Sequence, residues 1–262
     1  SPSRGYTSET LGCPIYPVGG PNEKNFKTIR RPFKNITDWR LGTTLLEADF
    51  LINFAHVKGH PSCGFGALFK NLALGAMMGV TRGEIHDTQH FDRYFFPEKL
   101  GPDPAAAIDR ILAACPHEGL IRDKDKPDEL HIHFDNCNQC GRCLKVAPPG
   151  SLKIDPANFA AFVECNAIAV KLVLDHFPDG NATFISLANQ LTPVCDCFGF
   201  TTMPILPDAG IFGSDDIVAV DQAALDVTAQ TPLIEEALPL AMEIHCREGH
   251  PFRQLHGPLK DP

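Results

Sequence analysis

The stretch Phe50-Leu51-Ile52-Asn53-Phe54-Ala55-His56-Val57-Lys58-Gly59-His60 begins with a short apolar run that is typical of a buried β-strand. A turn that carries glycine and histidine follows, from His56 to Gly66. The spacing of Leu68, Leu72 and Met78 then predicts a helix over 67–78. Strand, loop and helix in this order are the usual unit of α/β layers. The sequence therefore predicts an α/β fold with a layered core of sheet and helices.

The remaining elements are spaced along the chain in the same way. Residues 1–42 are rich in Pro, Gly and Arg, which indicates loops with short strands, and 82–104 show no clear period. Apolar spacing predicts a helix over 158–177, a strand over 183–188, a helix capped by Ser214 that runs through Leu225, and a last helix over about 232–247.

Residues 105–155 differ in character, with short elements, proline pairs, many charges and a cysteine motif. We expect them to form a small inserted ferredoxin-like (α+β) module. Residues 1–104 and 156–262 would then form the α/β core.

Composition excludes some classes of function. Lys+Arg number 23 and Asp+Glu 32, a net charge of −9, which disfavours general nucleic-acid binding. No apolar run approaches the roughly 20 residues of a membrane span, and no signal peptide is recognisable. Ten cysteines, three of them within one tight motif, suit a metal better than disulfides. We expect a cytoplasmic, reducing and plausibly anaerobic setting, without membrane or nucleic-acid partners.

The motif Cys137-Asn138-Gln139-Cys140-Gly141-Arg142-Cys143 has the C-x2-C-x2-C spacing that wraps one loop around three corners of an iron–sulfur cube. Zinc sites use pairs of ligands separated by a longer stretch. The motif therefore predicts one [4Fe–4S] cluster on Cys137, Cys140 and Cys143.

The fourth ligand is predicted from what the motif lacks. Ferredoxin runs continue to a Cys-Pro whose cysteine binds the other cluster in two-cluster proteins, and here that position is Ala147-Pro148. Cys115-Pro116 has the missing form upstream, and the three cysteines of a first run are replaced by Ala105, Ile108 and Ile111. This pattern favours a two-cluster module reduced to one cluster, with Cys115 as fourth ligand. The rivals are Cys195, Cys197 and Cys165, the last more plausibly a core residue.

A second group of candidate residues follows the first predicted strand. The glycine turn that opens the helix over 67–78 indicates an anion site, because free N–H groups at a helix N-terminus and the helix dipole favour negative charge. Lys58, His60 and Lys70 would strengthen it, beside His56.

Beyond the strand over 183–188, Cys195-Asp196-Cys197 places two thiols around a carboxylate, a group able to bind a second metal ion or to do redox work. Further carboxylates and imidazoles for this region are Asp208, Asp216, Asp221, His86 and His90. The aspartates are equally suited to capping helices.

With these residues identified, the chain resembles the domain of unknown function 362 family, whose members are often labelled uncharacterised iron–sulfur centre proteins. The resemblance spans most of residues 10–230. It rests, in order, on Ala48 through His60, Gly64 through Leu72, the cysteine run, Cys195-Asp196-Cys197, and Pro207 through Asp221. It implies the fold and a cluster. Members often carry two ferredoxin runs and usually an additional N-terminal α/β segment, so we expect part of the protein to be missing here.

The leading hypothesis is an iron–sulfur oxidoreductase component. Low-potential electrons would pass from the cluster to a site built from His56, Lys58, His60, Lys70 and Asp196 with the two nearby cysteines. Its partner would be a redox protein or a small anionic substrate. The alternatives are a non-catalytic electron-transfer or scaffold subunit of a larger complex, in a homo-oligomer or hetero-complex, and a metal-dependent hydrolase or lyase with a structural cluster.

Overall fold

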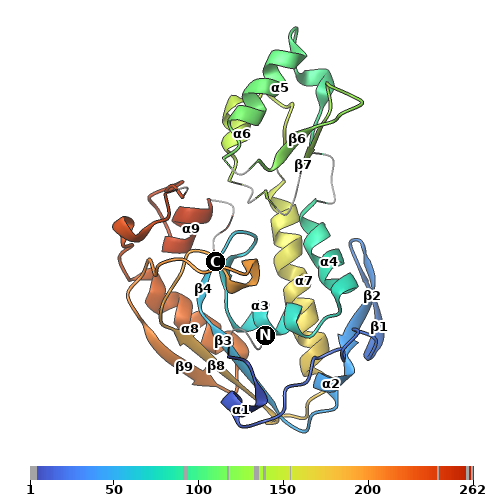
Figure 1. Cartoon of the computed structure of the whole chain (residues 1–262), viewed down its shortest axis with the longest axis vertical. Coiled ribbons are helices and arrows are strands. Elements are labelled where there is room, and N and C mark those ends of the chain that lie inside the picture. Colours follow the sequence, from blue (N-terminus) through green and yellow to red (C-terminus); the bar gives the residue numbers. More distant parts are fainter. Residues whose placement is uncertain are drawn as a thin grey trace.

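The computed structural model describes residues 5–90, 94–116, 118–132, 136–137, 140–153, 155–240, 242–257, 260 and 262. Figure 1 shows a main body of sheet and helices, and a smaller lobe above it that contains α5, α6, β6 and β7. The predicted α/β class is confirmed, because helices pack on a mixed sheet in the main body.

A three-stranded sheet forms the centre of the main body, in the order β3-β8-β9. Its strands are β3 (Leu51–His56), β8 (Ala182–Ala188) and β9 (Gly210–Ser214). β3 and β8 are parallel, from Leu51 opposite Ala182 to His56 opposite Leu187, and β9 is antiparallel to β8. The carboxyl ends of β3 and β8 therefore meet at one edge, where loops that follow both strands can contribute to one site.

Helices cover one face of this sheet. They are α3 (Leu68–Gly75), α8 (Ile217–Ala229) and α7 (Pro156–Leu174), which packs on α3. Strand β3 alternates accordingly: Leu51, Asn53 and Ala55 are buried, whereas Ile52 and Phe54 are 61% and 58% exposed on the opposite face. Asn53 is satisfied in this interface, since its amide donates to Leu68 O at 3.0 Å and its oxygen accepts from Asn71.

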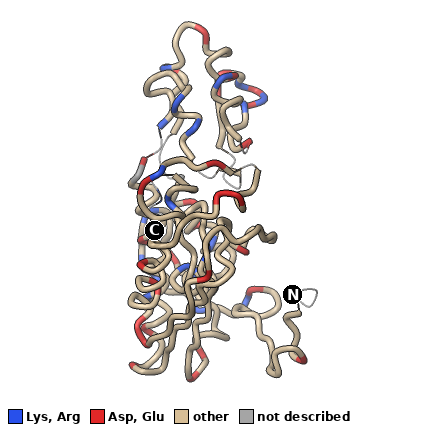
Figure 2. Tube along the Cα trace, turned by 90° about the vertical axis from the view of Figure 1, so that its left-hand side faces the viewer, with Lys and Arg blue, Asp and Glu red and all other residues tan. Residues whose placement is uncertain are grey.

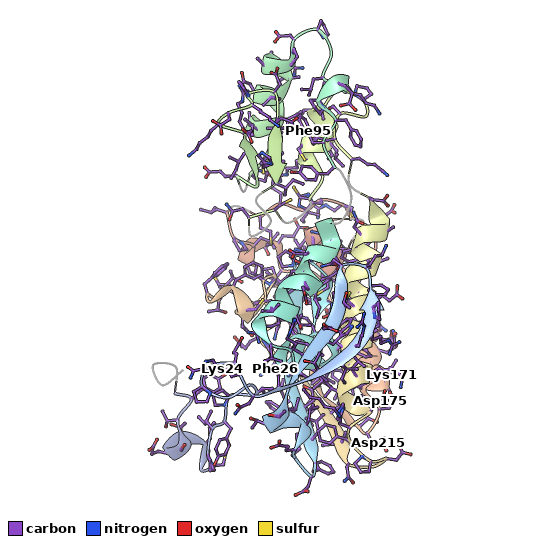
Figure 3. The ribbon with its side chains drawn as sticks, turned by 90° about the vertical axis from the view of Figure 1, so that its right-hand side faces the viewer. Lys24, Phe26, Phe95, Lys171, Asp175 and Asp215 are labelled. Carbon is purple, nitrogen blue, oxygen red and sulfur yellow. The ribbon has the colours of Figure 1, made fainter. Side chains whose placement is uncertain are left out.

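Helix α7 is long and apolar enough to cross a membrane, over Ala157–Leu174, and half of this stretch is buried inside the fold. Its buried residues include Phe162, Cys165 and Val173. They join Trp39, Leu68 and other side chains in the largest apolar cluster of the main body. Core packing therefore accounts for the apolar character of this helix, and Cys165 is the core residue that its position predicted. Lys171 and Asp175 form an ion pair of 2.7 Å at the C-terminal end of α7 (Figure 3).

The remaining elements of the main body surround this core. A hairpin of β1 and β2 packs against α2 and α4, and a short hairpin of β4 and β5 precedes α3. In Figure 2 the N-terminal segment stands apart from the rest of the body. The bounds are α1 (Ser8–Leu11), β1 (Phe26–Phe33), β2 (Ile36–Gly42), α2 (Thr43–Leu46), β4 (Lys58–His60), β5 (Gly64–Gly66), α4 (Gly79–Asp87), α9 (Pro251–His256) and the 3-10 helices η2 (Thr88–His90), η3 (Pro97–Lys99), η4 (Asp196–Phe198) and η5 (Glu235–Ala237).

The smaller lobe has its own apolar core. Helix α5 (Pro104–Ala113) and helix α6 (Arg142–Val146) contact each other, and strands β6 (Leu120–Arg122) and β7 (Leu130–Ile132) pair antiparallel. An antiparallel bridge joins Phe95, labelled in Figure 3, to Leu152. The core gathers Phe95, Leu100, Ala107, Ile108, Ile111, Leu120 and Leu130, with Cys115, Cys143 and Ala147 packed against it.

Two predicted features differ from the structure, and one helix lies where none was predicted. The predicted helix over 232–247 is wrong: within the described residues 232–240 and 242–247, η5 is the only helix. Pro239 biases Leu238 to extended backbone, with φ −65° and ψ 135°. The cap of α8 is Asp216, which accepts from Val218 N and Ala219 N, while Ser214 Oγ accepts from Asp216 N. Helix α4, at the start of the region without a clear period, has mainly polar residues and only two buried side chains.

Candidate functional site

Seven side chains gather at the carboxyl ends of β3 and β8. His56 ends β3, and Lys58 and His60 lie on β4, which follows it directly. Lys70 comes from the first turns of α3, and Cys195, Asp196 and Cys197 come from the loop after β8. The structure thus brings together His56, Lys58, His60, Lys70 and Asp196 with the two nearby cysteines, the residues of the hypothesised reaction site.

The two thiols of this group are held by an ammonium group. Lys70 Nζ lies 3.5 Å from Cys195 Sγ and 3.3 Å from Cys197 Sγ, and donates to both. Cys195 is buried, whereas Cys197 is exposed. The hydrogen bond between the two thiols, with the positive charge of Lys70, lowers the pKa of Cys195, and the same bond raises the pKa of Cys197. The pair therefore shares one negative charge.

His60 completes the surroundings of the thiols and is held in one tautomer. Its Nδ1 accepts the backbone N–H of Ser62 at 3.0 Å, so this nitrogen carries no proton. The proton of the neutral ring is therefore on Nε2, which lies 3.5 Å from Cys197 Sγ. Burial lowers the pKa of His60 far below its ordinary value, with help from Lys70, so the ring stays neutral. Nε2–H is thus a second donor to the thiol pair.

The carboxylate between the two cysteines is turned toward other partners. Asp196 Oδ2 lies 3.4 Å from Lys58 Nζ and 3.4 Å from His56 Nδ1. His56 Nε2 in turn lies 2.6 Å from Asn189 O, the residue just beyond β8. Although partial burial opposes ionisation, Lys58 and His56 lower the pKa of Asp196. Its negative charge is therefore neutralised beside the thiols.

The ligand atoms of His60, Cys195 and Cys197 lie within 4.8 Å of one another, so this group could hold a metal ion. A cation would have to displace the Lys70 ammonium and take a nitrogen of His60 that carries a proton here. Neutral imidazole binds metals through an unprotonated nitrogen.

The sequence did not single out three further residues around the site. Cys63 donates to Phe65 O at 3.0 Å, and burial raises its pKa to about 12 despite Lys70, so it stays a thiol. His256 Nε2 lies 2.8 Å from Pro193 O in the loop that leads to Cys195. Lys260 is fully buried, and its Nζ has no hydrogen-bond partner among the residues that the structure describes.

The predicted cluster ligands lie at the base of the smaller lobe. Gly119 N donates to Cys115 Sγ at 3.1 Å, and a Cβ on Gly119 would lie 2.9 Å from Cys137 Cα. Burial, and then the neighbouring thiols of Cys137, Cys140 and Cys115, raise the pKa of Cys143 to about 12. The loop of Cys115 thus packs directly on Cys137, and the other three thiols lie close enough to Cys143 to affect its pKa.

Lys260 interacts electrostatically with the cysteine motif and with Cys63. Burial lowers its pKa to about 8, while the thiols of Cys137, Cys140 and Cys63 act in the opposite direction. Cys63 is in turn close enough to Cys195 to be affected by its charge. A fully buried ammonium without a partner is costly unless an anion approaches it. The charge of Lys260 therefore suits an anionic group at Cys137 and Cys140.

The anion site predicted at the N-terminus of α3 is already filled. Asp221 of α8 accepts the backbone N–H groups of Leu68 and Phe69 at 3.1 and 2.9 Å. Its own carboxylate thus takes the place of an external anion. Burial raises the pKa of Asp221 to about 6. The expectation that these N–H groups point outward to a ligand is therefore corrected.

The other acidic and imidazole candidates have structural partners. Asp208 accepts from Gln190 N at 2.7 Å, and Asp216 caps α8. His86 packs against the ring of Phe162 at 5.3 Å between centroids. The side chain of His90 lies outside the described residues. The capping interpretation therefore holds for Asp216 and Asp221, whereas Asp208 binds the backbone of the loop after β8.

Comparisons with known proteins agree with the resemblance seen in the sequence. The family described as Domain of unknown function (DUF362) matches residues 2–226. Searches of the curated proteins and of the solved structures found no match. Because the match covers most of the chain, the protein belongs to the DUF362 family.

Proposed function

We propose that the chain holds one [4Fe–4S] cluster on Cys115, Cys137, Cys140 and Cys143, and that it is the redox component of an oxidoreductase. The observation that carries this is the packing of the Cys115 loop on Cys137, with Gly119 between them. A cube of iron and sulfide lies between its four thiolates, so these stand further apart than the ligands of a single ion. Four thiols near enough to influence one another electrostatically suit that geometry.

The arrangement of the smaller lobe supports a ferredoxin-like module. Its order is the strand position at Phe95, then α5, β6, β7, α6 and the strand position at Leu152. Strand, helix, strand, strand, helix, strand is the order of the ferredoxin-like fold. Each helix is followed by the corresponding dipeptide, Cys115-Pro116 after α5 and Ala147-Pro148 after α6.

Lys260 supports a cluster independently of the motif. An iron–sulfur cluster with four thiolates carries net negative charge, and nearby charge is one of the features that set its potential. The buried ammonium of Lys260, without a hydrogen-bond partner in the described part of the chain, is placed to balance this charge. When bound, the cluster would supply single low-potential electrons.

The second site, at Cys195 and Cys197, is the proposed destination of these electrons. Lys260 interacts electrostatically with Cys137 and Cys140 of the motif, and with Cys63 and His60 beside the second site. Its charge therefore acts on residues of both regions. We further propose a reducing, cytoplasmic setting and a redox protein as partner, in keeping with the ten cysteines of the sequence.

The test is anaerobic purification of the full chain, followed by iron and sulfide analysis and spin-resonance spectroscopy after reduction. We expect about four irons per chain and a reduced-cluster signal. Cys115→Ser should lower the iron content, whereas Cys195→Ser should leave it unchanged. The matched control is Cys246→Ser, in the C-terminal segment. Two irons or none in the wild-type protein would refute the cluster. If Cys195→Ser loses iron and Cys115→Ser does not, the fourth ligand is Cys195 in the second site.

A further inference from the structure

We propose that Cys195 and Cys197 are a redox-active thiol pair that reduces a disulfide presented by a partner protein. This inference deepens the proposed function, because it rests on that function for the source of electrons and names the chemistry of the second site. It is carried by the donors around the two sulfurs, by the unequal exposure of the two cysteines, and by the apolar rim of the site.

The donors favour a thiolate over a metal. Lys70 Nζ contacts both sulfurs, at 3.5 and 3.3 Å, and the protonated Nε2 of His60 faces Cys197 Sγ. Both are N–H donors that stabilise negative charge on sulfur. A metal ion would need these positions for itself, and the ammonium would repel it. The arrangement therefore activates sulfur as a nucleophile.

The two cysteines differ in the way that disulfide exchange needs. Cys197 is exposed and can meet a partner, whereas Cys195 is buried behind it. Their sulfur atoms lie within 4.8 Å of each other, so a small movement of η4 brings them into bonding distance. Asp196, which would repel a thiolate if it faced the sulfurs, is bound to Lys58 and His56 instead.

The rim of the site is apolar and accessible. Phe198, Phe200 and Met203 follow Cys197 and are 43%, 53% and 67% exposed. The rings of Phe198 and Phe200 lie 6.3 Å apart, and the ring of Phe198 lies 6.0 Å from His60. Neighbouring exposed apolar side chains mark a contact surface. They fit a disulfide within an apolar peptide segment better than one in a small, highly charged molecule.

The reaction balances as follows. Cys197 passes its proton to the thiolate of Cys195 across the hydrogen bond between the two sulfurs. As thiolate it then attacks one sulfur of the partner disulfide, whose S–S bond breaks to release the first partner thiolate. Cys195 then attacks Cys197 Sγ in the mixed disulfide and releases the second partner thiolate. The partner gains two electrons and two protons, one proton from the remaining thiol of the pair and one from solvent. The new Cys195–Cys197 disulfide returns to the starting pair, one thiol and one thiolate, by taking up two electrons and one proton. The proposed cluster supplies these electrons singly, and a small dithiol supplies them together.

The experiment measures the oxidation state of each cysteine directly. The cluster-loaded full chain is equilibrated anaerobically in mixtures of oxidised and reduced dithiothreitol, alkylated with a maleimide and digested for mass spectrometry. We expect Cys195 and Cys197 to lose the label together, with one two-electron midpoint, while Cys246 stays labelled. If Cys195 and Cys197 stay labelled in every mixture, the proposal is overturned. The same holds if added Co²⁺ binds at one ion per chain and protects both cysteines from alkylation under the same conditions.

Variants test the direction of attack and the substrate. In Cys195→Ser, Cys197 should remain trapped in a mixed disulfide with insulin, whose disulfides serve as the probe. Cys197→Ser should trap none. Lys70→Met should slow trapping by about tenfold to a hundredfold, the rate equivalent of one hydrogen bond to a charged group. Lys171→Met, at the far end of α7, is the control and should not change the rate.

Insulin and oxidised glutathione are compared to identify the source of the disulfide. We expect faster trapping of insulin, and Phe200→Ser should slow insulin alone. Equal rates with glutathione would overturn the assignment to a protein partner. Iron is counted in every sample: iron without disulfide formation refutes this inference alone, and disulfide formation without iron refutes the proposed function alone.

Discussion

Replacing Asp221 by Asn should change how the stability of the fold depends on pH. Asp221 is 6% exposed, and its carboxylate accepts the first two N–H groups of α3, the helix that carries Lys70. Burial raises its pKa from 3.8 to about 6, despite these two hydrogen bonds. At about 1.36 kcal/mol per pKa unit, the charged form is disfavoured in the folded chain by about 3 kcal/mol.

The sign follows from linkage. Because the folded pKa lies above the unfolded one, the stability that Asp221 contributes is full below pH 3.8 and is lost as the pH rises through about 6. Asn keeps an acceptor oxygen and has no charge to bury. The free energy of unfolding of Asp221→Asn, relative to wild type, should therefore rise by about 2 to 3 kcal/mol between about pH 4 and pH 7.

The assay is urea unfolding of cluster-free protein at the two pH values. Trp39 is the one tryptophan of the sequence and is fully buried, so its fluorescence reports loss of the core into which α3 packs. Asp216→Asn is the control for loss of an aspartate cap at an exposed position, on α8. A difference between Asp221→Asn and wild type that is the same at both pH values would refute the buried-charge reasoning.

Three other substitutions test the packing around the cysteines. Gly119→Ala would place a methyl group 2.9 Å from Cys137 Cα, so we expect less iron per chain at unchanged helix content; full iron occupancy would contradict the packing of the two loops. Gly59→Ala would place a methyl group 2.4 Å from Pro193 O. We expect a loss of about 1 to 3 kcal/mol in the free energy of unfolding, which calorimetry would record as a fall of several degrees in the midpoint of thermal unfolding. An unchanged midpoint would contradict this contact. Lys260→Met should stabilise cluster-free protein at neutral pH by about 3 kcal/mol in urea unfolding, because burial lowers the pKa of Lys260 from 10.5 to about 8. As the pH rises through about 8 toward 10.5, Lys260 loses its proton and the destabilisation of the wild type disappears, so the two proteins should become equally stable. A variant that is less stable than wild type at neutral pH would contradict the reasoning.

The sequence was sufficient to predict the elements whose local pattern agrees with the sheet topology. The apolar run that ends at His56 predicts β3, and the spacing of Leu68 and Leu72 predicts α3. Both elements bury regularly spaced residues in one core. Loops that follow two parallel strands meet at one edge of the sheet. For that reason Lys58 and Cys197, far apart in the chain, could be expected in one site.

Contacts made by single residues from distant segments could not be predicted. Asp221 caps a helix that begins 153 residues earlier, and no local signal marks it for that position. Lys260 is buried next to Gly64, where a Cβ would lie 2.4 Å from Lys260 O. Cys63 has no partner motif in the sequence. Tertiary packing determines all three, so periodicity and spacing carry no record of them.

The winding of 104–113 into α5 has an evolutionary consequence. Ala105, Ile108 and Ile111, the positions that a second cluster would need, recur at helical spacing, and both isoleucines are fully buried in the core of the lobe. New cysteines there would sit in a rigid helix, leave cavities and meet no loop able to wrap a cube. If the lobe descends from a two-cluster module, as the cysteine motif predicts, recovery of a second cluster would require the helix to unwind before any ligand could be selected. Changing Ala147 to Cys in one step would then gain nothing, so the proposed reduction to one cluster would be hard to reverse.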